Sequence, residues 1–503
     1  MALINSILSW VMKKRIHQIE LFIKYPVEVQ QEVFRKLIRS AAHTEWGKKY
    51  GYQDTHKYET FRERVPIQSY DSLKPFIDRT MDGEQNILWP TDITWFSKSS
   101  GTTAGRSKFI PVSQESLEDC HFKAGKDTLS LYCNNFPNTK LFDGRSLMLA
   151  GSKSINKLSN GSFYGDLSAI LVENLPFWAE FRTTPDPEIA LMDDWEAKIQ
   201  RIVDTCSKEN VTSITGVPSW LLVVCRQILD ANGKSDLREI WPGLELFMHG
   251  GVSFEPYREQ FKSIIPHGDM HYLETYNASE GFFAMQDQTS HGDMLLMLDY
   301  GIFYEFIPMN EFGSENPKAL CLGEVEKGVN YAMLITTNAG LWRYMIGDTI
   351  EFTSTSPYRI RITGRTKHFI NAFGEELIVD NAEKALAFAG KETQAKVMDY
   401  TAAPVYMDEG AGAHEWIIEF EDQPDDFEKF VNILDQKLRE ENSDYDAKRF
   451  NDKVLKRPII HKAKPGLFYQ WLKDKDKLGG QNKVPRLSNN RDYLNDLLER
   501  NAK

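Results

Sequence analysis

Cysteine is scarce in this sequence of 503 residues, with five cysteines that are widely spaced, odd in number and without a C-x-x-C pair. A disulfide framework needs paired cysteines and a zinc ribbon needs closely spaced ones, so neither is supported. A run of about 20 apolar residues, the length that spans a membrane, is also missing. The apolar residues between 3 and 12 precede basic residues 13–15, the reverse of a secretory signal, and their spacing predicts an amphipathic helix. We therefore expect a cytoplasmic protein.

An excess of positive charge is absent as well. The 60 Lys and Arg residues are outnumbered by 72 Asp and Glu residues, which gives a net charge of -12. Such a surface does not attract nucleic acid or an anionic membrane, so neither is an expected partner. An anionic ligand must instead be bound by a local basic pocket. The hydrophobic fraction of 41% suits a chain with a real core, and the length predicts two to four domains.

Two common nucleotide-binding signatures are missing, but one loop has suitable chemistry. Residues 99–108 read Ser-Ser-Gly-Thr-Thr-Ala-Gly-Arg-Ser-Lys. Closely spaced hydroxyl and backbone N–H groups followed by two cations can surround a polyphosphate. The loop is not a Walker A motif, because Arg106 stands where glycine is required, and no G-x-G-x-x-G occurs. A solvated turn is the alternative for such a segment.

Three further motifs follow this loop in the chain. Residues 276–281 read Tyr-Asn-Ala-Ser-Glu-Gly, residues 343–348 read Arg-Tyr-Met-Ile-Gly-Asp, and residues 364–374 begin Gly-Arg-Thr-Lys and end in glycine. With the loop, and in this order, they resemble the motifs of the adenylate-forming superfamily, which includes acyl-CoA synthetases, peptide-synthetase adenylation domains and luciferases.

Within this superfamily the sequence resembles the acyl acid amido synthetases, the auxin-responsive Gretchen Hagen three family of plants and its bacterial relatives. The resemblance lies in Ser-Ser-Gly-Thr followed by Lys108, in the serine of Tyr-x-x-Ser-Glu, and in residues 481–487, which read Gln-Asn-Lys-Val-Pro-Arg-Leu. The sequence departs from the family at Ala104, Asn277 and Met345. The last departure could alter a contact to the nucleotide or the acyl chain.

The resemblance implies a role for each matching residue. The residues expected to bind ATP are Ser99, Ser100, Gly101, Thr102, Thr103, Tyr276, Asn277, Ser279 and Asp348. Of these, the loop residues would surround the β- and γ-phosphates, Tyr276 would stack on adenine, and Asp348 would accept hydrogen bonds from the ribose.

The remaining implied roles belong to charged residues. Lys108, Arg365 and Lys483 are the expected catalytic residues, and Glu280 is the expected ligand of Mg²⁺. Lys367 would lie at the hinge between two domains. Without the other motifs, Lys108 would be read as a surface lysine and Glu280 as part of a solvated turn.

The pattern of the chain predicts an α/β protein. A helical first part of about 70 residues precedes strand-like runs at 146–150, 244–248, 269–274, 294–298 and 331–336, which alternate with helical patterns at 193–205 and 255–264. From the resemblance we expect a large N-terminal adenylate-forming domain with flanking helices over residues 1–363. A smaller, mobile α+β domain, residues 364–503, would close over the site.

The expected reaction uses ATP and Mg²⁺ to activate a small carboxylic acid as an acyl-adenylate, whose acyl group then passes to the amine of an amino acid. A thioester ligase acting on coenzyme A is the nearest alternative, and a non-catalytic nucleotide-binding protein is a further one. His267, Asp269 and His271 alternate along a predicted strand and could in principle bind a metal, although a surface strand edge also explains them. The sequence does not define the acyl acid, the amino acid or the oligomeric state.

Overall fold

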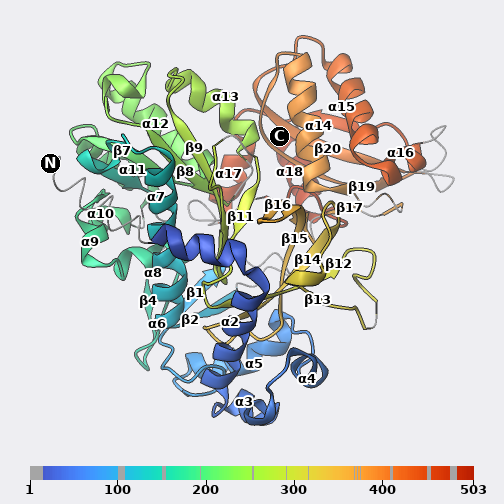
Figure 1. Ribbon diagram of the computed structural model, residues 1–503. Coiled ribbons are helices and arrows are strands. Elements are labelled where there is room, and N and C mark those ends of the chain that lie inside the picture. Colours follow the sequence, from blue (N-terminus) through green and yellow to red (C-terminus); the bar gives the residue numbers. More distant parts are fainter. Residues whose placement is uncertain are drawn as a thin grey trace.

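The structure, a computed structural model, describes residues 15–99, 108–149, 155–192, 194–251, 254–289, 292–314, 316–366, 369–370, 372–373, 375, 377–407, 412–449, 455–475 and 484–503. The helix predicted between residues 3 and 12, the loop 100–107, Lys367 and Lys483 therefore lie outside the described residues. The fold is mixed α/β, with a large N-terminal body and a smaller C-terminal part (Figure 1).

From residue 15 onward the first part of the chain is helical, as its pattern predicts. After helical residues 15–24 come α2 (Pro26–Ala41), α3 (Glu45–Lys49), α4 (Tyr58–Arg64) and α5 (Tyr70–Met81). Helix α5 begins with a capping box in which Ser69 and Ser72 satisfy each other's backbone N–H groups. Helix α2 begins with Pro26 and buries the face that carries Phe34, Leu37 and Ile38. Of these helices, α3, α4 and α5 lie at the lower end of the molecule in Figure 1, and α2 leads down to them.

The largest sheet among the described residues has 12 strands. In the order of the sheet they are β13 (Leu320–Cys321), β12 (Ile302–Pro308), β14 (Asn330–Thr337), β15 (Tyr344–Thr355), β16 (Tyr358–Arg365), β11 (Met294–Leu296), β10 (Gly281–Met285), β9 (His271–Ala278), β8 (Leu246–Gly250), β7 (Val211–Gly216), β3 (Arg145–Met148) and β6 (Thr183–Thr184). Strands β6, β3, β7, β8 and β9 run parallel, and the rest pair antiparallel. The parallel half alternates with α11 (Trp195–Cys206), α12 (Pro218–Asn232) and α13 (Glu255–Ile264).

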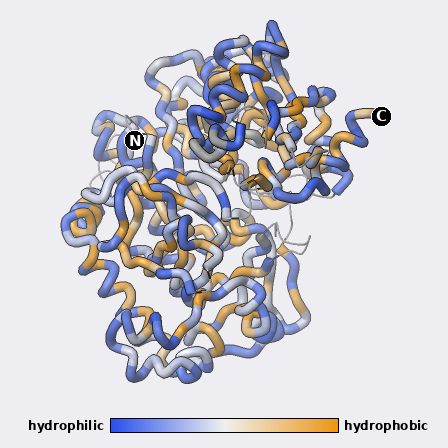
Figure 2. The backbone as a smooth tube through the Cα atoms, turned by 90° about the vertical axis from the view of Figure 1, so that its right-hand side faces the viewer, coloured by the Kyte–Doolittle hydropathy of each residue, from blue (hydrophilic) through white to orange (hydrophobic). Residues whose placement is uncertain are grey.

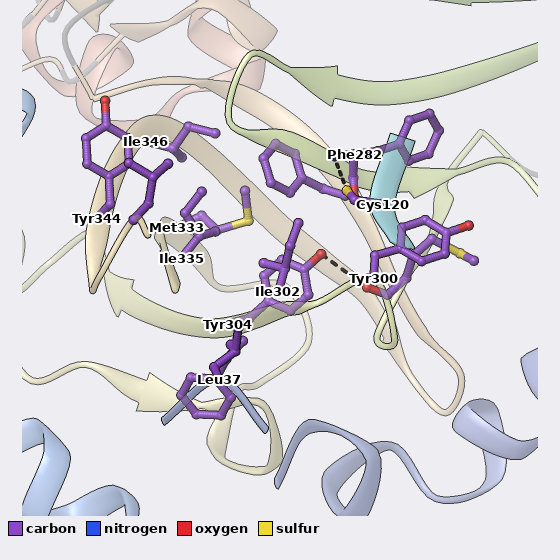
Figure 3. Close-up of a cluster of buried hydrophobic side chains, with 14 of the residues drawn as sticks. Leu37, Cys120, Phe282, Tyr300, Ile302, Tyr304, Met333, Ile335, Tyr344 and Ile346 are labelled. Atoms are coloured by element: carbon purple, nitrogen blue, oxygen red, sulfur yellow. Dashed lines mark hydrogen bonds between the residues drawn. The ribbon is translucent and has the colours of Figure 1, made fainter. Parts of the chain in front are cut away.

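The strands and helices expected from the pattern are present with shifted ends. The strand expected at 269–274 is β9, which begins only at His271 because pairing with β8 starts at Leu246 opposite His271. It also runs on to Ala278. The antiparallel half of the sheet covers the main hydrophobic core. Figure 3 shows part of this core, where Tyr304 of β12, Met333 of β14 and Tyr344 of β15 belong to one buried cluster.

A second, four-stranded sheet packs beside the first. Its order is β2 (Lys108–Val112), β1 (Trp95–Ser99), β5 (Phe163–Gly165) and β4 (Asn156–Lys157). Strands β1 and β2 are antiparallel, with Ser99 opposite Lys108, so the residues before and after the loop 100–107 face each other. After β2 the chain passes through α6 (Gln114–Ser116) and a π-helical turn (Leu117–Phe122) into α7 (Lys123–Asn135).

The C-terminal part has a sheet and hydrophobic cores of its own. It contains the pair β17 (Phe369–Ile370) and β18 (Leu377–Ile378), then α14 (Val379–Glu392), β19 (Lys396–Tyr406), β20 (Gly412–Asp422), α15 (Phe427–Glu441), α16 (Ser443–Arg449), β21 (Ile459–Lys462), α17 (Leu467–Asp474) and α18 (Asp492–Ala502). Seen from the side, it forms a lobe above the larger body, and hydrophobic stretches run through both (Figure 2).

Among the described residues, ion pairs connect this lobe to the body: Arg226 of α12 lies 2.5 Å from Glu421 of β20, and Lys473 of α17 lies 3.2 Å from Glu196 of α11. Strand β16 continues to Arg365, slightly past the boundary expected at 363/364, because Arg365 still pairs with Asp348 of β15. None of the described helices has the length and apolar character needed to cross a bilayer.

Candidate active site

Asp348 is the centre of the candidate site. It lies in β15, and one carboxylate oxygen, Oδ2, accepts a hydrogen bond of 2.7 Å from Tyr276 Oη of β9. The other, Oδ1, lies 2.8 Å from Nε of Arg365 in β16. In the sheet order β15-β16-β11-β10-β9, three strands separate Asp348 from Tyr276, so the sheet must curl strongly to bring them together. The motifs at 276–281, 343–348 and 364–374 therefore meet at one carboxylate.

A β-bulge aims Asp348 into the site. Opposite β14, the pairing jumps from Leu334 with Met345 to Ala332 with Thr349, which leaves the residues between them as an insertion in β15. Gly347 within this insertion has φ of 92°, a conformation that strongly favours glycine. Gly347 and Asp348 both lie inside strand β15.

The charges around Asp348 are closely coupled. The negative charge of Asp348 raises the pKa of Arg365 above its usual value, despite the opposing effect of burial. Burial, followed by the charge of Asp348, raises the pKa of Tyr276 well above that of an ordinary tyrosine. Tyr276 therefore stays a hydrogen-bond donor and Arg365 stays a cation.

Glu280 lies in the turn between β9 and β10, beside the same cluster. Burial raises the pKa of Glu280, while the positive charge of Lys108 opposes the rise. Tyr344 Oη approaches Glu280 Oε1 at 3.5 Å. Burial removes water from the Glu280 carboxylate and disfavours its negative charge, and a bound cation would compensate for that loss. The oxygen donors of Glu280 therefore fit Mg²⁺.

Ser279 connects this turn to the predicted phosphate loop. Its Oγ accepts a hydrogen bond of 3.0 Å from Ser97 Oγ of β1, and both side chains are buried. Strand β1 leads directly into the loop, and Lys108 opens the strand that leaves it. The described ends of the loop therefore lie at the same turn as Glu280.

Asn277 is placed by a close approach of two backbones. A Cβ atom added to Gly250 of β8 would lie 2.5 Å from the carbonyl oxygen of Thr275 and 3.2 Å from Asn277 Oδ1. Gly250 is thus required by the packing of β8 on β9, and Gly251 has φ of 79°. These two glycines satisfy the backbone geometry at the end of β8.

Several predicted residues fall outside the described part of the chain. They are Ser100, Gly101, Thr102, Thr103, Lys367 and Lys483, together with the side chain of Ser99. The segment after Lys483 is described and is held to β19, because Ala402 N donates to Arg486 O and Ser488 N donates to Ala402 O, at 2.9 and 3.0 Å.

Sequence reasoning gave no role to Arg343, Glu305 or Tyr70, which the structure connects to the site. Arg343 contacts both oxygens of Glu305 at 2.8–3.0 Å and donates to Val65 O at 2.7 Å, all in the interior. It therefore fixes the start of β15 against the N-terminal helices. Its place in the 343–348 motif was a usable signal, whereas nothing local distinguishes Tyr70.

Met345, one of the departures from the family pattern, lies away from this cluster. Its side chain packs with Ile307, Ala332 and Leu334, whereas its neighbours Tyr344 and Ile346 belong to the main core. Successive residues of a strand point to opposite faces, which explains the separation.

The three residues considered as a metal site have other partners. His267 contacts Asp236 at 2.6 Å, Asp269 pairs with Arg238 at 2.5 Å, and His271 Nδ1 lies 2.8 Å from Tyr132 Oη. Within the described residues no group of three or more His, Cys, Asp or Glu side chains is arranged to bind a metal ion.

The chain is similar in sequence to enzymes that are named as amido or amino acid synthetases. An indole-3-acetic acid-amido synthetase of Arabidopsis thaliana is 24% identical and aligns with 91% of this chain and 89% of its own length. A jasmonoyl–L-amino acid synthetase of Nicotiana attenuata is 24% identical over 67% of this chain and 68% of its own.

Solved structures share the fold. The acyl acid amido synthetase GH3.15 superposes with a TM-score of 0.79 at 19% identity, covering 97% of this chain and 96% of the other. A 2-hydroxyisobutyryl-CoA ligase in complex with an acyl-adenylate superposes with a TM-score of 0.58 at 12% identity, covering 94% and 91%.

Family profiles match most of the chain. The GH3 family N-terminal domain matches residues 15–270, the central domain residues 295–365, and the C-terminal domain residues 380–492. The first of these alone covers half of the sequence, and the three follow one another in chain order. This chain is a member of the GH3 family.

Proposed function

We propose that this protein is an ATP-dependent acyl acid amido synthetase, which activates a carboxylic acid as an acyl-adenylate and transfers the acyl group to an amino acid. The observation that carries the proposal is the contact of Asp348 with both Tyr276 and Arg365, beside Glu280 and Lys108. Four separate motifs contribute to this one cluster, and its mixture of carboxylates and cations suits a nucleotide.

In the first step the substrate carboxylate attacks the α-phosphorus of ATP. A bond forms between the carboxylate oxygen and phosphorus, and the bond to the bridging oxygen breaks, so that pyrophosphate leaves with the electron pair. Lys108 and residues 99–103 of the loop are proposed to hold the phosphates. Ser279 is proposed to lie near the α-phosphate, and Lys483 is proposed to be brought in from the C-terminal part. Catalysis then rests on alignment and on neutralising developing charge.

Asp348 is the proposed acceptor for the ribose hydroxyls. Its contacts with Tyr276 and Arg365 fix the carboxylate and leave each oxygen a second lone pair for the ribose. Tyr276 exposes only 4% of its surface, so its hydrogen bond to Asp348 supports an orienting role more directly than stacking on adenine.

Glu280 is the proposed Mg²⁺ ligand. Magnesium would supply charge neutralisation on the phosphate oxygens of ATP. The chain contributes the carboxylate of Glu280, which is partly shielded from water and lies near Lys108. Burial and the charge of Lys108 act on the pKa of Glu280 in opposite directions.

In the second step the amine of the acceptor attacks the acyl carbon, and AMP leaves with the electron pair of the broken C–O bond. The C-terminal part is proposed to move between the steps, with Lys367 at the pivot. On one side of residue 367, Thr366 N donates to Gly347 O at 2.8 Å within the body. On the other side, Glu375 is bound by His414 of the lobe at 2.7 Å.

An amino acid is the proposed acceptor because the named functions of the relatives are amido synthetases acting on indole-3-acetic acid and jasmonate. The thioester-ligase alternative shares the fold, as the coenzyme A ligase shows, and would use the same ATP site. The expected cytoplasmic location also belongs to this proposal and agrees with five free thiols.

The test is ATP–pyrophosphate exchange with a panel of aryl, indole and fatty carboxylates, followed by a competition between an amino-acid mixture and coenzyme A. We expect exchange with at least one acid and an amide product by mass spectrometry. An acyl-CoA product without amide would overturn the acceptor assignment. Failure of the protein to bind ATP would overturn the whole proposal.

A further inference from the structure

Tyr70 lies next to the predicted phosphate loop although it is far from every motif in the sequence. It is the first residue of α5, and its position is set by the capping box of Ser69 and Ser72. The side chain is 8% exposed. Burial raises the pKa of Tyr70 above its ordinary value, so the hydroxyl stays neutral.

The segment before Tyr70 is attached to the strand that carries Asp348. Gln68 N donates to Arg343 O and Met345 N donates to Gln68 O, both at 2.9 Å. Gln68 thereby forms an isolated parallel bridge with Tyr344. Helix α5 starts at Tyr70, two residues after Gln68. Because Gln68 is hydrogen-bonded to the start of β15, Tyr70 is also held at a fixed distance from it.

Tyr70 contacts the first two residues of β2 with two different groups. Its Oη accepts a hydrogen bond of 2.8 Å from the backbone N of Phe109. Its ring lies under the ammonium group of Lys108, with Nζ 5.6 Å from the ring centroid. Among the described strands β2 is at the edge of its sheet, and the outward N–H of Phe109 is bound by Tyr70 instead of by a further strand.

These contacts determine where the charge of Lys108 is held. Lysine is a flexible point charge on a long stem, and an aromatic face within about 6 Å attracts it. Lys108 is the first residue of β2, so holding its ammonium group over the Tyr70 ring fixes a positive charge where this strand leaves the predicted phosphate loop.

We infer that Tyr70 is a positioning residue for Lys108: it fixes the backbone where β2 leaves the phosphate loop and keeps the ammonium group over its ring, facing the nucleotide. This inference rests on the proposed function, because it assumes that Lys108 binds the phosphates of ATP.

The test is a double-mutant cycle on ATP binding, measured by calorimetry without any acyl acid. Tyr70→Leu removes both contacts and should raise the Kd for ATP about three- to thirtyfold, the range of a cation–π contact. Tyr70→Phe keeps the ring and should recover part of the affinity. In a Lys108→Ala background, Tyr70→Leu should change the Kd by less than about twofold, since its partner is already gone.

A matched control is Tyr50→Leu, which removes a similar ring from beneath Lys49 at 5.2 Å, beside α3. It should leave the Kd for ATP unchanged, while thermal unfolding reports the stability of every variant. If Tyr70→Leu weakens ATP binding by the same factor in both backgrounds, the role through Lys108 is wrong. If the parental protein does not bind ATP, the proposed function fails and this inference fails with it.

Discussion

At the scale of single residues, Asp348 combines a tyrosine and an arginine contact in a buried position. Asp348→Asn keeps the volume and removes the charged acceptor proposed for the ribose. We predict a Kd for ATP raised roughly tenfold to a hundredfold, since a hydrogen bond to a charged group is worth about 1.5–3 kcal/mol. Calorimetric titration of ATP measures the change.

The chain offers a closely matched control in Asp435. This buried carboxylate also accepts from a tyrosine, Tyr445, at 2.8 Å and pairs with an arginine, Arg449, at 2.6 Å, but it lies in the C-terminal lobe. Asp435→Asn should destabilise the fold without changing ATP affinity. Equal effects of the two variants on ATP binding would remove Asp348 from the site.

Glu280 allows a prediction with a pH dependence. Burial raises its pKa in the folded state, so its charge destabilises the fold above that pKa, and the destabilisation disappears once pH falls below the unfolded pKa. Glu280→Gln should therefore raise the unfolding temperature at pH 7 without nucleotide, and this gain should vanish in acid. The same variant should lose the Mg²⁺ dependence of pyrophosphate exchange.

The comparison variant is Glu305→Gln, which removes the charge of a carboxylate held by Arg343. It should lower the unfolding temperature at pH 7, because it leaves a buried arginine without its ion partner. Should Glu280→Gln also lower the unfolding temperature while keeping the parental Mg²⁺ optimum, the assignment of Glu280 is refuted.

At the scale of an element, the bulge in β15 controls the direction of Asp348. A Cβ on Gly347 would meet only Thr366 Oγ1, at 3.7 Å, so Gly347→Ala adds backbone strain at φ of 92° rather than a clash. We predict a loss of about 1–2 kcal/mol in the free energy of unfolding, together with weaker ATP binding as the bulge relaxes. Chemical denaturation and ATP titration measure the two effects.

Gly161 provides the control for this element. Its φ is also 92°, and no atom lies within 4 Å of an added Cβ. Gly161→Ala should lose similar stability and retain the parental Kd for ATP. If Gly347→Ala matches it in both measurements, the bulge does not direct Asp348.

At the scale of the whole molecule, a buried hydrogen bond between His414 and Glu375 holds the segment that follows residue 367 to the lobe. His414 Nε2 lies 2.7 Å from Glu375 Oε1, and neither side chain is exposed. Glu375 also accepts from Phe373 N at 2.6 Å. Although burial opposes it, the contact with His414 lowers the pKa of Glu375, so this stabilisation is present above the unfolded pKa and is lost as pH falls through the folded one.

We predict that His414→Asn destabilises the lobe by about 3–5 kcal/mol, the usual effect of breaking a buried pair. His461→Asn breaks a pair with Glu415 at the same 2.7 Å, but His461 is 38% exposed, so its effect should stay below about 1 kcal/mol. Hydrogen exchange should show faster opening of β19 and β20 in the first variant and unchanged protection of β9. Comparable losses in the two variants would contradict the importance of the buried pair.

Local features of this protein were predictable because short stretches of chain determine them. The strand near 269–274, the helical pattern of the described first part from residue 15 and the helices near 193–205 and 255–264 depend on neighbours in sequence, and all are present. The resemblance to the amido synthetase family was likewise carried by short motifs, and family profiles confirm it. The roles assigned to all of the site residues stay predictions.

Only the tertiary structure decided which of these motifs touch. Tyr276 and Asp348 meet because the large sheet curls across three intervening strands, and no local pattern encodes that curvature. The contact of Tyr70 with Lys108 depends on how α5 docks against β2. Asp269 pairs with Arg238, an arginine that a separate segment of the chain supplies. The sequence by itself determined the chemistry of each motif, since residue type and spacing are local. The packing of distant segments determined the site, since the contacts between motifs form only when the whole sheet has folded.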